Sequence, residues 1–151
     1  MLNDDGDIVR AIGFLAIYSA YLEDEMVKIV QMVDKFSPFK NKIEQFRLAD
    51  QARHLRKKLQ KCFEEVSDYP AKDNDKQRVD ILKDVERIAK ERNEYLHSQY
   101  ISESAGIIQE NRHQNTSYVI TSADIYGLAE DIFQLQGSVF GLIFVVERLK
   151  K

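Results

Sequence analysis

The chain has 151 residues, with 22 lysines and arginines against 25 aspartates and glutamates, and therefore a formal net charge of −3. This length predicts a single domain spanning residues 1–151, and a content of 44% hydrophobic and 31% charged residues excludes a disordered chain. The single cysteine, Cys62, excludes an intramolecular disulfide framework, and three scattered histidines make a poor zinc set. We therefore expect a one-domain protein without a cofactor or a metal ion.

Two stretches lack charged residues, residues 11–22 and residues 132–146. Both are shorter than the roughly 20 residues that cross a bilayer, and the second contains Gln134 and Gln136, so a buried helix is favoured over a tail anchor. The acidic opening around Asp4 and Asp5 differs from the basic start of a secretory signal. The sequence predicts a cytoplasmic protein that does not enter a membrane.

Apolar residues recur at steps of three and four from Asp7 to about residue 34, which predicts a long amphipathic helix. Pro38 ends it, because a proline disfavours helical dihedral angles in the residue before it. The same period predicts a second helix over about residues 40–66. A third helix is predicted from the capping residues 73–75 to about His97.

The segment from residue 100 to residue 120 holds short β-prone runs separated by polar residues, which predicts a hairpin-like excursion. From Ser122, the predicted N-cap, the helical period returns and continues to the C-terminus. The expected fold is all-α: a four-helix, mostly up-and-down bundle with a short β-hairpin around residues 100–120 before the last helix.

Several common site signatures are absent from the sequence, including a glycine-rich phosphate loop, His-Glu-x-x-His and Gly-x-Ser-x-Gly. The most informative string contains Arg92, Asn93 and His97 within six residues. An imidazole can move a proton, a guanidinium can hold a phosphate and an amide can orient either group, which are the parts needed for metal-free cleavage of RNA. On a regular helix Arg92 and His97 diverge by about 140°, so they need a helix end or a second subunit to converge.

The string Arg92-Asn93-x-x-x-His97 near the end of a later helix resembles the motif of the HEPN superfamily (higher eukaryotes and prokaryotes nucleotide-binding domains), whose members are small helical bundles. The resemblance implies a homodimer with two motifs facing one another. His97 would act on the proton of the ribose 2′-hydroxyl or of the leaving group, Arg92 would stabilise charge on the phosphate, and Asn93 would orient them. Products would carry 2′,3′-cyclic phosphate and 5′-hydroxyl ends.

The resemblance also implies a toxin or phage-defence setting, with an antitoxin or regulatory protein as partner. Members encoded beside a nucleotidyltransferase antitoxin often have tyrosine two residues after the histidine, where this chain has Gln99. Other members of the superfamily have lost catalysis. The alternative function is therefore a non-catalytic helical interaction or regulatory module, in which Asn93 and His97 form an ordinary helix-ending pair.

Charge is distributed unevenly along the chain. The acidic pair Glu23 and Asp24 either approaches the motif helix and holds Arg92 or His97, or forms an exposed acidic face. Residues 40–61 are strongly basic, and a stripe at helical spacing is a candidate for nucleic-acid binding, with a solvated, partly paired face as the alternative. The members of this basic stripe are Arg53, Arg56, Lys57 and Lys61.

Aromatic residues also follow helical spacing, which predicts packing in the core or in a dimer rather than a cofactor site. These residues are Phe14, Tyr18, Tyr21, Phe133, Phe140 and Phe144. The feature that separates an enzyme from an interaction module is whether Arg92 and His97 meet at an open cleft.

Overall fold

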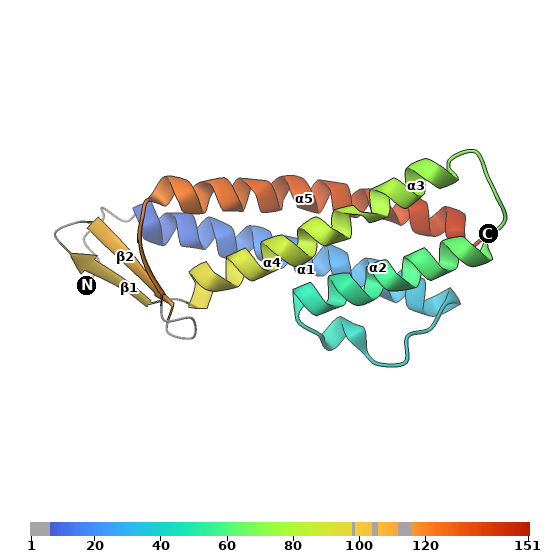
Figure 1. The fold of residues 1–151 in the computed structure, drawn as a ribbon, viewed down its shortest axis with the longest axis horizontal. Coiled ribbons are helices and arrows are strands. Elements are labelled where there is room, and N and C mark those ends of the chain that lie inside the picture. Colours follow the sequence, from blue (N-terminus) through green and yellow to red (C-terminus); the bar gives the residue numbers. More distant parts are fainter. Residues whose placement is uncertain (1–6, 98, 104–105, 112–115) are drawn as a thin grey trace.

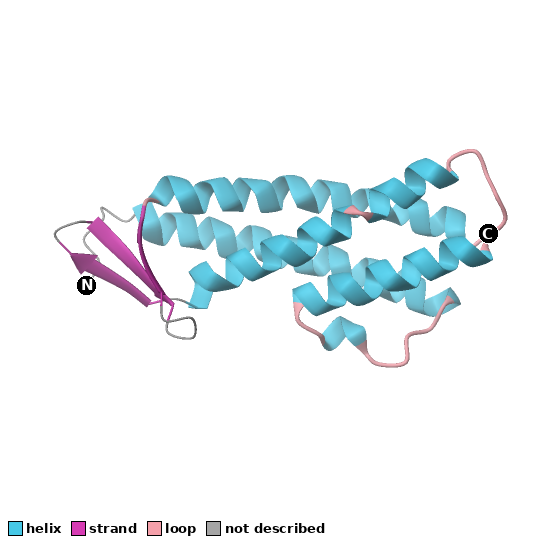
Figure 2. Cartoon of the chain, viewed as in Figure 1, coloured by secondary structure: helices cyan, strands magenta, loops and turns pink. Residues whose placement is uncertain are grey.

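The structure is a computed structural model and describes residues 7–97, 99–103, 106–111 and 116–151. These residues are mostly helical, which confirms the predicted all-α class at that level. Long helices lie along the long axis of the molecule, and short strands gather at one end of it (Figures 1 and 2).

Helices α1 (Asp7–Phe36) and α5 (Ser122–Leu149) form the central pair and run side by side in the same direction (Figure 1). Each buries an apolar stripe with a spacing of three and four residues, which is why both were predictable as amphipathic helices. Helix α1 ends two residues before Pro38, as expected. Helix α5 has Thr121 as its N-cap, one residue before the predicted Ser122, and the Thr121 amide donates a hydrogen bond to Asp124 Oδ2 at 3.1 Å.

Helix α2 (Leu48–Glu65) begins later than the predicted residue 40, because a loop and the short 3-10 helix η1 (Ile43–Gln45) come first. Phe46 and Arg47 both have extended backbone, with ψ of 160° and 149°, which separates η1 from α2. This loop carries the chain back along α1, so α2 runs in the same direction as α1, unlike the alternation of a mostly up-and-down bundle (Figure 1).

The predicted third helix is two helices, α3 (Lys72–Val79) and α4 (Ile81–His97). At the junction the Asp80 amide donates to the Gln77 carbonyl oxygen, and the Lys83 amide donates to the Asp80 carbonyl oxygen, so the backbone tightens to three-residue hydrogen bonding. Val79 and Leu82 stay buried on either side of the break. The apolar period therefore continues through it, and the described residues form five α-helices where four were predicted.

Strands β1 (Gln99–Glu103), β2 (Gly106–Asn111) and β3 (Thr116–Ile120) form an antiparallel sheet in the order β1-β2-β3. A simple hairpin was predicted, and the difference is β1, whose Ile101 pairs with Ile108 of β2. Gln109 fastens the sheet to α4, because its Nε2 donates to the Glu94 carbonyl oxygen at 3.0 Å. His113, placed by the sequence at the hairpin tip, lies outside the described residues.

A buried charged network joins α3 to α5 near the C-terminus. Arg148 donates from Nε and Nη2 to the two carboxylate oxygens of Asp75 at 2.7 and 2.6 Å, and the Tyr69 hydroxyl donates to Asp75 at 2.9 Å. The hydrogen bonds from Arg148 lower the pKa of Asp75, whereas burial, with the neighbouring Asp75, raises the pKa of Tyr69 to about 12. Asp75 was predicted to help cap a helix, and it instead anchors two helices to each other.

Within the described residues, α5 is the one helix whose length and composition match those of a membrane span. In the apolar part of this helix, 39% of the residues are buried inside the protein. Core helices of soluble proteins have the same length and apolarity, so the match by itself carries little weight.

Candidate active site

The three residues of the predicted motif lie in the last two turns of α4, at the end of the helix that meets the sheet. Arg92 is 8% exposed, Asn93 is half-buried, and His97 is exposed as the last residue of the helix. Arginine is rarely buried unless it is paired, because removing a charge from water is costly. The burial of Arg92 therefore requires a partner.

That partner is Glu23 on α1, whose Oε1 accepts a short hydrogen bond from Arg92 Nη1. Asn93 Oδ1 accepts two further bonds, from Arg92 Nε at 3.2 Å and from Nη2 at 2.8 Å. Of the two arrangements open for Glu23 and Asp24, the structure thus shows the acidic pair beside the motif helix. Asn93 orients the guanidinium, and Glu23 neutralises it.

A pocket of about 980 Å³ opens between α1, the start of α2 and the end of α4. Arg92, Asn93 and His97 all line it, so the two side chains that diverge on a regular helix reach one shared cavity. The remaining lining residues are Glu23, Asp24, Val27, Glu44, Phe46, Arg47, Leu48, Gln51, Lys90 and Glu94. The sequence criterion of an open cleft that contains both Arg92 and His97 is met.

The pocket mixes charges of both signs. Arg47, Lys90 and Arg92 supply cations, and four of the lining residues are carboxylates. Among the described residues, no group of three or more histidine, cysteine and carboxylate side chains could hold a metal ion. The described pocket therefore offers an imidazole, guanidinium and ammonium groups and carboxylates for binding and proton transfer.

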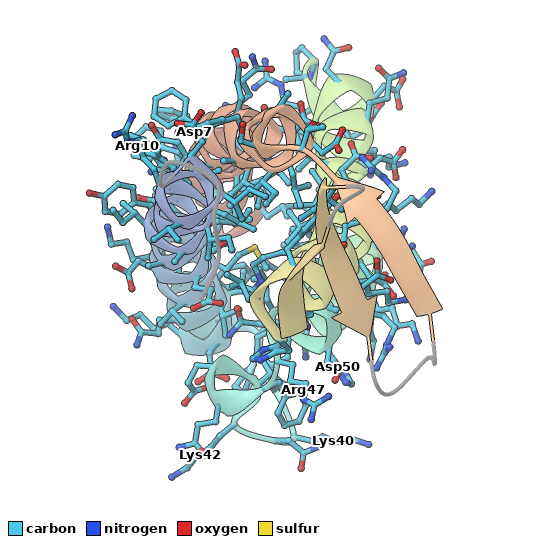
Figure 3. The ribbon with its side chains drawn as sticks, turned by 90° about the vertical axis from the view of Figure 1, so that its left-hand side faces the viewer. Asp7, Arg10, Lys40, Lys42, Arg47 and Asp50 are labelled. Atoms are coloured by element: carbon cyan, nitrogen blue, oxygen red, sulfur yellow. The ribbon has the colours of Figure 1, made fainter. Side chains whose placement is uncertain are left out.

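Arg47 and Gln51 are lining residues that the sequence did not single out. Arg47 precedes α2 and extends from the lower part of the molecule in Figure 3, close to Asp50. Gln51 is buried and its Nε2 donates to the Ile43 carbonyl oxygen at 3.2 Å, which fixes the loop that forms this wall. Neither residue has a sequence signal, because only the return of residues 37–47 along α1 brings them near α4.

The basic stripe of α2 lies outside the pocket lining. Arg53 Nη2 contacts Asp50 at 2.8 Å, and Arg56 Nη2 lies 3.7 Å from a carboxylate oxygen of Glu86 on α4. Lys57 and Lys61 are exposed. Half of the stripe is thus engaged in ion pairs within the protein, and the structure does not bring it together with the motif.

No protein-family model, curated protein or solved structure matches this chain. The likeness to the HEPN superfamily therefore rests on the motif and its setting, and it enters the function as a proposal.

Proposed function

We propose that the pocket binds RNA and that the protein is a HEPN-like, metal-independent endoribonuclease. The observation that carries this proposal is that Arg92, Asn93 and His97 line one open pocket, with Arg92 held in place by Glu23 and Asn93. In this proposal α1, α2, α4 and α5 correspond to the four-helix bundle of the superfamily, and the strands are an excursion before the last helix.

The chemistry divides among the three motif residues. Cleavage joins the ribose 2′-oxygen to phosphorus and breaks the bond from phosphorus to the 5′-oxygen of the next nucleotide. One proton leaves the 2′-hydroxyl and another reaches the 5′-oxygen, and the exposed His97 imidazole transfers one of these protons. The products carry a 2′,3′-cyclic phosphate and a 5′-hydroxyl.

Arg92 stabilises the charge that develops on the phosphate. A guanidinium has five N–H donors, and Glu23 and Asn93 take three of them, which leaves two for a phosphate oxygen. Arg47 and Lys90 add cations on two other elements of the pocket wall. In the homodimer that the resemblance implies, His97 of the partner subunit supplies the second proton transfer.

The test is incubation of purified protein with mixed-sequence RNA in excess EDTA, followed by analysis of the product ends. Wild type is expected to cleave and leave cyclic phosphate, whereas His97→Ala and Arg92→Lys are expected to lose at least about a hundredfold in rate. His113→Ala serves as the control for loss of a histidine outside the motif. Retained cleavage by His97→Ala would contradict the proposal, and circular dichroism checks that the variants fold.

The second candidate is a non-catalytic interaction or regulatory module, and one observation favours it: large apolar side chains are exposed along α1 and α5. RNA binding without cleavage by the wild-type protein would support this module. Under either function, the toxin or phage-defence setting and the antitoxin or regulatory partner follow from the resemblance alone.

A further inference from the structure

The aromatic residues that the sequence assigned to a core or a dimer lie largely outside the core. Six large apolar side chains on α1 and α5 are between 40% and 54% exposed. We refer to them together as the outer seam, which consists of Phe14, Ile17 and Tyr21 from α1 and Phe133, Phe140 and Phe144 from α5. Since they are not buried within the chain, the remaining prediction for them is an interface.

The outer seam is continuous across the two helices. The Phe14 ring contacts Tyr126, the Tyr18 ring contacts Phe133, and the Phe140 ring lies edge-on to Phe144 at 6.3 Å between centroids. Residues 11–22 and 132–146 contain no charged side chain on any helix face. A connected apolar surface of this kind on a folded domain marks a binding site.

We propose that the outer seam is the docking surface for a second copy of this chain. Its area suits that occupant: five half-exposed rings present roughly 500 Å² of apolar surface at about 200 Å² per ring. Ile17, Val9 and the small residues between the rings bring this close to the roughly 800 Å² that each partner contributes to a standard interface.

The surface is also self-complementary in shape. An added Cβ at Gly13, Gly137 or Gly141 would meet no heavy atom within 4 Å, so these three glycines leave open hollows beside the rings. A glycine at such a helical position costs about 1 kcal/mol relative to alanine. Rings on one copy that fill glycine hollows on the other give the two-fold interface in which the same patch serves both subunits.

Charges at the ends of the seam fit an antiparallel pairing of α1 with its copy. Centred on Ile17, such a pairing places Arg10, seven residues before the centre, opposite Asp24 of the partner subunit, seven residues after it. Figure 3 shows Arg10 projecting outward from α1 beside α5. The α5 side of the rim carries Glu130 and Asp131, which would be repelled by the anionic surface of a membrane. A second copy therefore suits the rim better than lipid does.

This dimer differs from the one that the motif resemblance implies. It is formed by the α1–α5 face rather than by α4, and it does not depend on RNA binding or cleavage. Loss of the dimer and loss of nuclease activity are therefore separate outcomes in separate assays.

The experiment is sedimentation velocity on the full chain over a wide range of concentration. Wild type is expected to sediment at twice the 17.6 kDa mass of the chain. Phe133→Glu and Phe140→Glu, both at exposed positions, are expected to raise the dimer Kd by about thirtyfold or more, as loss of an aromatic anchor does. Gln60→Glu adds the same charge to an exposed site on α2 and is expected to remain dimeric.

A charge exchange tests the orientation. Arg10→Glu is expected to weaken the dimer, and the double variant Arg10→Glu with Asp24→Arg is expected to restore it. Flotation with vesicles of zwitterionic and anionic lipid tests the competing occupant. The proposal is overturned if wild type is monomeric throughout, if both seam variants remain dimeric, or if monomeric wild type floats with vesicles.

Discussion

Two arginine–carboxylate pairs in this protein have opposite burial. Near the C-terminus the Asp75 side chain is 1% exposed and its partner Arg148 is 35% exposed. In the pocket the Arg92 side chain is 10% exposed and its partner Glu23 is 50% exposed. The buried member is the anion in the first pair and the cation in the second.

This difference indicates what each pair can do. Both oxygens of Asp75 are bonded to Arg148, and Tyr69 adds a third bond, so the pair is closed within the fold. Arg92 gives a single N–H to Glu23, whose side chain is half in solvent beside the pocket. A buried cation whose partner is free to move can exchange that partner for an anionic ligand. The first pair holds the structure together, and the second is suited to binding.

The largest expected effect is on the closed pair. Arg148→Met leaves the Asp75 carboxylate buried without its main partner, and we expect the free energy of unfolding to fall by about 3 kcal/mol. Urea denaturation measures the change. Lys150→Met removes the exposed Lys150–Glu147 pair as a control and should change the free energy by no more than about 0.5 kcal/mol. Equal effects of the two variants would mean that Asp75 does not depend on Arg148.

The closed pair should also make stability depend on pH at both extremes. The pKa of Asp75 is lowered in the folded state, so its contribution is present above the usual value of 3.8 and is lost as the pH falls through the lowered pKa. The pKa of Tyr69 is raised to about 12, so its contribution is present below pH 10.0 and is lost as the pH rises from there towards 12.

Tyr69→Phe separates these two contributions, because phenylalanine does not titrate. Urea titrations at a series of pH values should show a smaller alkaline loss of stability in Tyr69→Phe than in wild type, with the acid limb retained. An unchanged alkaline limb would assign that loss to other groups.

The open pair should respond in binding rather than mainly in stability. Glu23→Gln removes a negative charge from the pocket and frees Arg92 for a phosphate, so we expect RNA to bind up to about tenfold more tightly, or 1.4 kcal/mol. Fluorescence anisotropy with a short labelled RNA measures the Kd. Glu64→Gln, at an exposed site outside this pocket, makes the same change in net charge and should have little effect. Weaker binding by Glu23→Gln would show that Glu23 is needed to position Arg92.

The sequence predicted the parts of the fold that depend on local periodicity. Helices α1 and α5 follow from apolar residues spaced along 30 and 28 residues. The break at Asp80 and the late start of α2 were missed, because Val79, Leu82 and Ile43 are buried in both the predicted and the observed arrangement. Apolar spacing reports which residues are buried, and it does not report where the backbone leaves the helix.

The candidate site divides in the same way. Arg92, Asn93 and His97 lie on one helix, so their spacing was visible in the sequence. Glu23 lies 69 residues from Arg92, and its approach to the motif helix was one of two open alternatives. Arg47 reaches the pocket only because the loop before α2 turns back along α1. Contacts between distant segments are set by tertiary packing, for which a single sequence carries no periodic signal.

The smallest expected effect concerns the basic stripe and compares it with the pocket. Lys57 and Lys61 are exposed and lie outside the pocket lining, so Lys57→Glu with Lys61→Glu should weaken RNA binding by about threefold and lower its salt dependence slightly. Arg47→Ala removes one charge from the pocket wall itself and should weaken binding more than the double variant does. Anisotropy titrations at several salt concentrations measure both. A larger effect of the stripe would move the RNA path from the pocket to the outer face of α2.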